Sequence, residues 1–421
     1  MRHTLLKYVR ISLLWFLIAA IFGFLLRLHS VTPLGESFNY QKVLQSHSHI
    51  AFLGWIFNML FIFLIRQYPS VFSHTKLNHR ILFISMQIAI LLIATGLLIW
   101  GYKLVAILFL SIHAAITIII AVKFLKKADK KLPGTLPIKL GLIMMIISYI
   151  GTLALGPISA MGYKFSDGYY FSIYFYMHFQ YSGLFLFAGI GMLLNSFYSQ
   201  NINFNIKKSE IYLFFAATIG ALSISTLFMD PPKIMHITAF LSSALQIYVV
   251  AKVLFNNLNQ SLIQKFSTQE LIIPASLALM LFIKLISQLM APFPLFTELA
   301  VSNRFTVIAF LHLNFLGLTT VTLLYLMDRY FISCSVYKSY IITFLAAFAI
   351  SEIFLLITGL KIGGFSPIQM NYANTGAAFL LFFTVALLNV YCIAPVKFLG
   401  KFKCEHKPAK FIKKIISTKH L

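Results

Sequence analysis

The sequence predicts an all-α integral membrane protein with twelve transmembrane helices in three pseudo-symmetric groups of four and both termini in the cytoplasm. Three observations lead to this prediction. The 421-residue chain is 60% hydrophobic and only 10% charged, whereas a soluble domain carries roughly a quarter charged residues. Twelve apolar stretches each approach the roughly 20 residues that a helix needs to cross the hydrocarbon of a bilayer. Lys and Arg gather on one side of the topology that these stretches define.

Turn signals separate the apolar stretches along the chain. Segments such as KKADKKLPGTLP, MDPPK and KIGGFSP place charged residues beside Pro or Gly, which end helices. The first stretch has the basic start of a secretory signal but lacks a small-residue cleavage site, so we expect it to remain as a helix. The spans are expected near residues 9–28, 47–66, 81–101, 104–125, 138–160, 169–195, 210–229, 234–256, 270–291, 304–327, 339–360 and 372–396.

The basic residues predict the orientation of the chain. With the amino terminus inside, 26 of the 34 Lys and Arg fall on the cytoplasmic side, seven fall outside and Lys284 lies within a span. Cytoplasmic loops carry this excess, so the formal charge of +24 indicates topology and the lipid bilayer rather than nucleic acid as partner. We expect a multi-pass protein of the bacterial inner membrane with a basic cytoplasmic tail at 397–421. No CxxC or CxxCH occurs, which argues against disulfides and covalent haem.

Three histidines open the same short pattern on even-numbered spans. His49, His178 and His312 are each followed by an aromatic residue three positions on and by a glycine five positions on. The histidines are 129 and 134 residues apart, and each interval contains four predicted spans. We therefore expect one histidine-bearing helix in each of three quasi-repeats, near residues 1–135, 136–268 and 269–396.

This pattern suits a metal or a flat cofactor. Imidazole is a good ligand for iron, copper or zinc, and Gly54 and Gly317 each remove a side chain where a helix or a macrocycle would approach. His47 and His49 are two residues apart and point to different sides of a helix, and the repeat favours His49. For each histidine taken alone, a hydrogen bond to a neighbouring helix remains the alternative.

The three segments HIAFLGW, HFQYSGL and HLNFLGL resemble helices two, six and ten of the haem–copper oxidase subunit I superfamily, which includes the nitric oxide reductases. The resemblance implies a low-spin, bis-histidine haem b between His49 (or His47) and His312. It also implies copper or another second metal near His178, with His236 as a candidate second ligand.

The sequence departs from the family at the oxygen-reducing site. Phe310 stands where helix ten of the family has its first histidine, and ISTLFMDPP lacks the copper-binding histidine pair that ends helix seven. Complete oxygen reduction is therefore not expected, no catalytic residue is assigned, and the existence of an enzymatic activity is left open. The resemblance implies electron transfer, or the handling of nitric oxide or oxygen, with electrons supplied by a partner protein or quinol.

Two other functions compete with a haem protein. One is a proton-coupled secondary transporter, in which His178, Lys284 and Glu352 would form the proton path. The other is a cofactor-free assembly subunit. Lys284 and Glu352 lie in the outer halves of spans nine and eleven, and because an unpaired charge there is costly we expect them to pair with each other or to relay protons.

Overall fold

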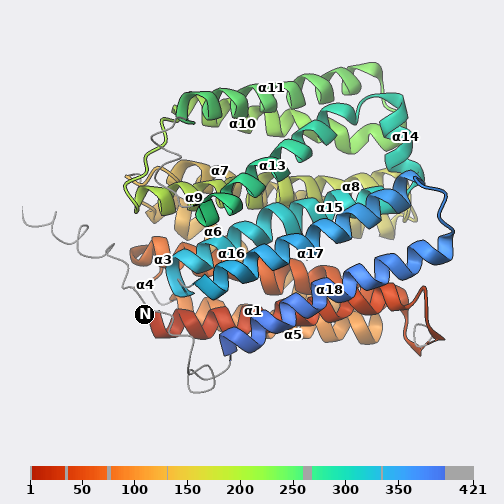
Figure 1. Ribbon diagram of the computed structural model, residues 1–421, viewed down its shortest axis with the longest axis horizontal. Helices are drawn as coiled ribbons and strands as arrows, with labels where there is room; N and C mark the ends of the chain where they lie inside the picture. The colour runs from red at the N-terminus through yellow and green to blue at the C-terminus, as the bar shows by residue number, and fades with distance from the viewer. Residues whose placement is uncertain are drawn as a thin grey trace, which may run out of the picture.

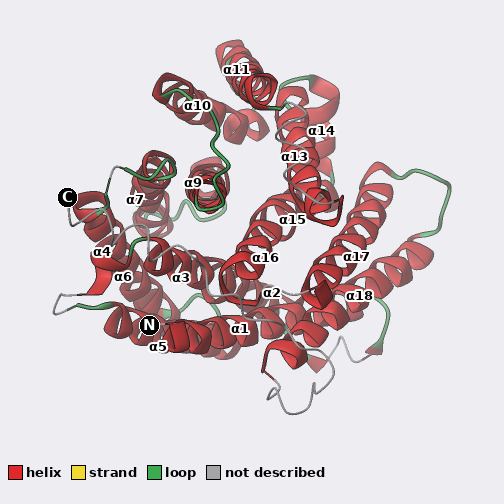
Figure 2. Ribbon diagram, turned by 60° about the vertical axis from the view of Figure 1, so that its left-hand side comes forward, coloured by secondary structure: helices red, strands yellow, loops and turns green. Residues whose placement is uncertain are grey.

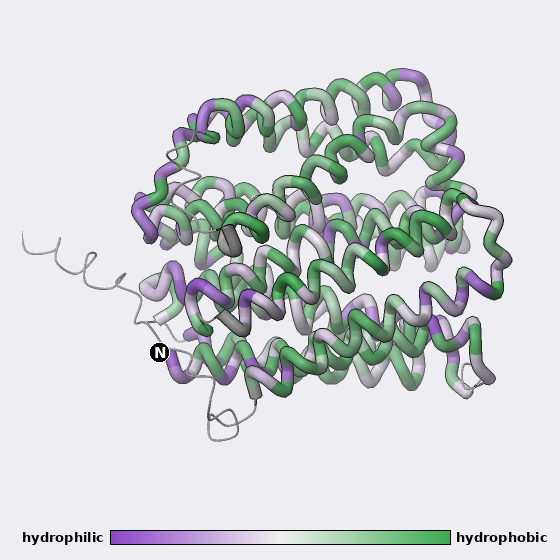
Figure 3. The backbone as a smooth tube through the Cα atoms, in the orientation of Figure 1, coloured by the Kyte–Doolittle hydropathy of each residue, from purple (hydrophilic) through white to green (hydrophobic). Residues whose placement is uncertain are grey.

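A computed structural model describes residues 2–33, 37–73, 77–129, 131–258, 268–332 and 335–393. Within these ranges the protein is a bundle of helices without strands, and twelve helices are long and apolar enough to cross a membrane. The helices run side by side, and hydrophilic residues gather toward the two ends of the bundle (Figure 1, Figure 3). The chain is therefore a multi-pass membrane protein, as predicted. The expected basic tail at 397–421 lies outside the described residues.

Each predicted span corresponds to one of these helices. Four spans include short helical segments of other geometry and so carry several labels. In order the spans are α1 (Arg2–Leu28), α2–η2–α3 (Tyr40–Gln67), α5 (His79–Trp100), α6 (Leu104–Lys127), α7 (Thr135–Ala160), α8–η3–α9 (Asp167–Tyr198), α10–η4 (Lys208–Met229), α11 (Lys233–Asn257), α13 (Thr268–Met290), α15–η5–α16–η6 (Arg304–Ile332), α17 (Ser335–Leu360) and α18 (Pro367–Ile393).

Short polar side chains begin several of these helices. Asn39, Asn78 and Ser166 each accept a hydrogen bond from a backbone N–H in the first turn of the helix that follows, which satisfies donors that an isolated helix leaves free. Two short helices connect spans: α4 (Pro69–Ser73) follows span two, and α14 (Pro294–Ser302) precedes span ten. The sequence indicated only a turn where α14 lies.

The histidine-bearing spans form the centre of the bundle. In their most apolar windows 78%, 61% and 61% of the residues of spans two, six and ten are buried, against at most 50% in any other span. Figure 2 shows α3, α9 and α16, which continue these spans, with the other helices arranged around them. Lipid-facing spans keep one apolar face exposed, whereas a central span must pack on all sides.

A π-helical segment follows each of the three histidines directly. η2 (Ile50–Phe57), η3 (Phe179–Phe185) and η5 (Leu313–Thr320) begin at the residue after His49, His178 and His312. A π-helix has a wider turn than an α-helix and is rare, and it occurs mostly at functional sites. In η5 the hydroxyls of Thr319 and Thr320 donate to main-chain carbonyls five residues earlier, which helps to satisfy the backbone of the wider turn.

The glycine of each motif receives a side chain from the span that precedes it. A Cβ atom on Gly54 would lie 2.9 Å from Cβ of Trp15, and one on Gly183 would lie 2.9 Å from Cβ of Met144. A Cβ on Gly317 would lie 2.8 Å from Sδ of Met280. The same packing relation thus joins α1, α7 and α13 to the central spans. The pseudo-symmetry of the whole bundle and the side on which the termini lie stay predictions.

We expect Gly54→Leu and Gly183→Leu each to lower the free energy of unfolding by roughly 1–3 kcal/mol, because the added side chain forces two packed helices apart. Thermal unfolding of the purified protein in detergent measures the change. Gly376→Leu on α18 is the matched control, since no atom lies within 4 Å of a Cβ placed there. Equal stability of all three variants would contradict the close packing.

Candidate functional site

The aromatic residues of the three motifs meet at the centre of the bundle. The ring centroids of Phe52 and Phe315 are 5.4 Å apart, and those of Tyr181 and Phe315 are 6.2 Å apart, both edge to face. Edge-to-face pairs are favourable beyond the area they bury. Each ring lies three residues after its histidine, so the contacts place the three motifs at a similar depth. Two clusters of polar side chains lie around this aromatic centre.

The first cluster joins spans one, two, ten and eleven. The Nδ1 of His47 donates to the carbonyl of Ala19 at 2.8 Å, and this ring lies within electrostatic reach of His312. The Nδ1 of His312 lies 3.4 Å from Oε1 of Glu352. Neither of these last two atoms has a hydrogen-bond partner in the described part of the chain. The imidazole of His312 and the carboxyl of Glu352 thus lie close together, both partly buried, without forming a hydrogen bond.

His49 belongs to a different environment. Its Nδ1 donates to the carbonyl of Gln45 at 2.9 Å, and its Nε2 lies 3.5 Å from the hydroxyl of Tyr102, which sits between α5 and α6. Burial raises the pKa of Tyr102 to about 12, so this hydroxyl keeps its proton and can donate a hydrogen bond to Nε2 of His49. Both nitrogens of His49 are therefore engaged. The repeat favoured His49 as the residue facing His312, and the contacts favour His47 instead.

Two arginines lie over one phenylalanine beside the first cluster. The guanidinium carbons of Arg27 and Arg304 are 5.6 Å and 5.4 Å from the ring centroid of Phe305, at the end of the bundle predicted to face outward. Neither guanidinium forms an ion pair with any residue that the structure describes. Arg27 also lies within electrostatic reach of Glu352. The arrangement concentrates positive charge next to His47 and His312 and suits an anionic group.

The second cluster lies among spans five to nine. His178 is buried and its Nε2 donates to the carbonyl of Thr218 at 2.9 Å. The Nζ of Lys284 donates to Oγ of Ser182 at 2.9 Å. The pairing expected between Lys284 and Glu352 does not form, since Lys284 faces spans six and ten while Glu352 faces His312.

The other expected metal ligand, His236, is tied to a turn. Its Nδ1 donates to the carbonyl of Pro292 at 2.9 Å, just before α14. No contact joins the rings of His178 and His236 in the described ranges. Over the same ranges no group of three or more His, Cys, Asp or Glu side chains is arranged to hold a metal ion. A second metal near His178 therefore stays a prediction without further support.

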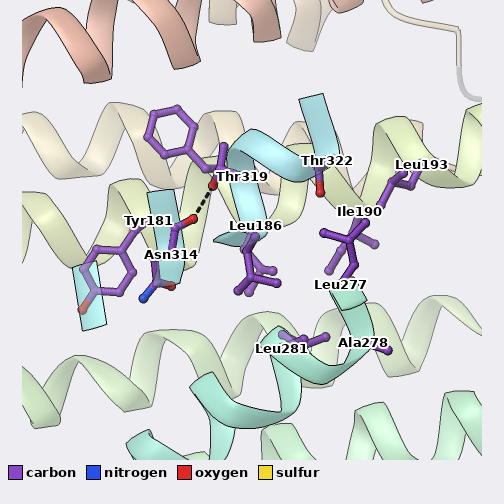
Figure 4. A pocket seen from close by; sticks show the side chains of 13 residues that line it. Tyr181, Leu186, Ile190, Leu193, Leu277, Ala278, Leu281, Asn314, Thr319 and Thr322 are labelled. Carbon is purple, nitrogen blue, oxygen red and sulfur yellow. Dashed lines mark hydrogen bonds between the residues drawn. The ribbon is translucent and has the colours of Figure 1, made fainter. Parts of the chain in front are cut away.

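A small cavity lies between spans six, nine and ten (Figure 4). Its volume is about 130 Å³, and its lining is apolar except for a few groups that include Asn314, Thr319 and Thr322. Tyr181 and Asn314 lie at one end of it, and Leu193 lies at the other. Cofactor pockets typically measure roughly 300–1,000 Å³, so this cavity is too small for a macrocycle.

Comparison with known proteins adds no assignment, because the chain matches no protein-family model and has no significant match among curated proteins. Sequence reasoning named His47, His312, Glu352 and Lys284 and placed the last two in the outer halves of their spans. It missed the paired arginines, because Arg27 and Arg304 read as ordinary outer loop charges in the sequence. The available signal was that Arg27 lies at the end of span one and Arg304 at the start of span ten, both on the side predicted to face outward.

We expect a stability coupling between His312 and Glu352. His312→Leu leaves the carboxyl of Glu352 among apolar helices without its neighbour, and adding Glu352→Leu removes that penalty. A double-mutant cycle on thermal unfolding should give an interaction of about 0.5–3 kcal/mol. The control combines His178→Leu with Glu352→Leu, and there the two changes in unfolding free energy should add. Additivity of the His312 pair would show that the 3.4 Å contact contributes no stability.

Proposed function

We propose that the protein binds a low-spin b-type haem in the bacterial inner membrane, with His47 and His312 as axial ligands. Its task is electron transfer, or the handling of nitric oxide or oxygen. The observation that carries the proposal is the pair of imidazoles on spans two and ten, which pack together through Phe52 and Phe315. In both rings Nδ1 faces an oxygen atom and Nε2 has no hydrogen bond among the described residues.

The residues fit a haem in two respects. A histidine ligand usually directs its second ring nitrogen to a carbonyl or carboxylate, which orients the ring and raises its basicity. The carbonyl of Ala19 and the carboxylate of Glu352 are placed for that role. The guanidiniums of Arg27 and Arg304, which form no ion pair with the described residues, suit the carboxylate substituents of the macrocycle. When bound, the haem would supply one-electron redox chemistry.

The proposal includes membership of the haem–copper oxidase superfamily, with an altered second metal site near His178. Phe310 stands in place of a histidine, and its ring lies 5.2 Å from the ammonium nitrogen of Lys284. The amine of Lys284 and two aromatic rings thus lie beside His178, where the family would hold a metal. Electrons would come from a partner protein or quinol, and both termini would lie in the cytoplasm.

A proton-coupled transporter is the second candidate. It is favoured by the polar residues of spans five to nine, where Gln246 donates to Thr218 and Lys284 donates to Ser182, next to the 130 Å³ cavity. Buried ionisable groups in membrane proteins commonly lie on ion pathways. This candidate predicts a colourless protein that moves a solute in sealed vesicles, while a cofactor-free assembly subunit predicts neither property.

The test is the absorption spectrum of the detergent-purified protein produced in haem-supplied cells. We expect a Soret band and sharp α and β bands on reduction, because two imidazoles make the iron low-spin. His47→Ala and His312→Ala should abolish these bands.

His49→Ala and His178→Ala are the matched controls and should retain the spectrum. A colourless wild-type protein would refute the haem proposal. Loss of the bands in His49→Ala with retention in His47→Ala would show instead that the sequence repeat had identified the correct ligand.

A further inference from the structure

Lys284 is a buried amine in the middle of α13. Its side chain is only 1% exposed, and its Nζ donates to Oγ of Ser182 at 2.9 Å. The same atom lies 4.9 Å from the ring centroid of Tyr181 and 5.2 Å from that of Phe310. Helices from three spans, six, nine and ten, therefore enclose the amine.

No carboxylate balances this amine. Among the described residues no acidic side chain forms an ion pair with it. The ionisable groups near it are His178 and the phenol of Tyr181. Of the segments packed against α13, which are α11, η5, α16 and α17, the last carries Glu352, whose carboxyl lies beside His312 instead. A membrane-buried charge without a partner is costly and is usually functional.

The hydrogen bonds around Lys284 do not satisfy an ammonium group. An ammonium has three N–H donors, and one is used by Ser182. One turn further along the same face of α13, Oε1 of Gln288 is buried without a hydrogen-bond partner. The two aromatic faces offset part of the cost of a positive charge there. The site can therefore hold Lys284 either as a neutral amine or as a protonated ammonium.

We propose that Lys284 is a reversible proton-binding site, neutral at rest and protonated when negative charge enters the centre of the bundle. In the proposed function, on which this last link rests, that charge is an electron delivered by a quinol or a reduced protein. A bound haem would accept that electron; the amine of Lys284 would take up one proton from a hydronium ion of the solvent, so that an O–H bond breaks as a new N–H bond forms on Nζ. Total charge in the membrane interior is then unchanged, which lowers the cost of reduction there.

The variants Lys284→Met and Lys284→Arg test the proposal, and Lys164→Met is the matched control. The ammonium of Lys164 also lies 4.9 Å from an aromatic ring, that of Phe165, but it is outside the spans and exposed. Methionine keeps the length of the side chain without a titratable group. Arginine keeps a charge that cannot be released.

We expect Lys284→Met to unfold at a higher temperature than the wild type in detergent, with a difference that widens as the pH falls from 9 to 6. Unfolding of the wild type releases a neutral amine into water, where it binds a proton, so lower pH favours unfolding. One proton corresponds to about a tenfold change in the unfolding constant per pH unit. Lys284→Arg should unfold at a lower temperature than the wild type, and Lys164→Met should match it.

A Lys284→Met variant that is less stable than the wild type at every pH would overturn the proposal, because it would indicate a permanently charged, well-satisfied ammonium. In haem-loaded protein, the wild-type midpoint potential should fall by up to about 59 mV per pH unit, and that slope should vanish in Lys284→Met. An unchanged slope would overturn the link to the electron. Colourless protein with the expected pH-dependent stabilisation would refute the haem proposal and leave the proton site supported.

Discussion

The close contact of three central spans is the constraint on which the rest of the structure depends. A helix in lipid forms all its backbone hydrogen bonds internally. Association between helices therefore relies on side-chain packing and on small residues where two helices touch. Gly54, Gly183 and Gly317 remove that bulk at equivalent places, and each accepts a side chain of the preceding span. The aromatic residues two positions before these glycines then meet in the middle.

Local properties of the sequence were enough to predict the spans. Hydropathy and length located all twelve helices, because crossing hydrocarbon imposes the same requirement on each segment separately. The pattern around the histidines also identified the spans that turned out to be central. The π-helical segments were not predicted, since nothing in a seven-residue motif reveals how many residues complete a turn. The helix α14 was missed because its apolar residues are too few to form a span.

The site was predicted less completely, because side-chain partners depend on the rotation of each helix about its axis. Both His47 and His49 were candidates, and only the contacts with Ala19 and Tyr102 separate them. Lys284 and Glu352 were expected to pair on the grounds of charge and depth alone. Their helices turn these side chains toward different neighbours, Ser182 and His312. Depth follows from residue number along a straight helix, whereas facing direction follows from packing across the whole bundle.

The π-helical segments have a consequence for the lower halves of the central spans. A wider turn acts like one residue inserted into an α-helix, so everything beyond it is rotated by about 100° relative to a regular helix. Spans two, six and ten each carry such an offset directly after a histidine. The face that carries each imidazole is therefore not continuous with one face of the helix farther down the span. Residues above and below each segment therefore meet different neighbouring helices even where they lie on one face of a regular α-helix.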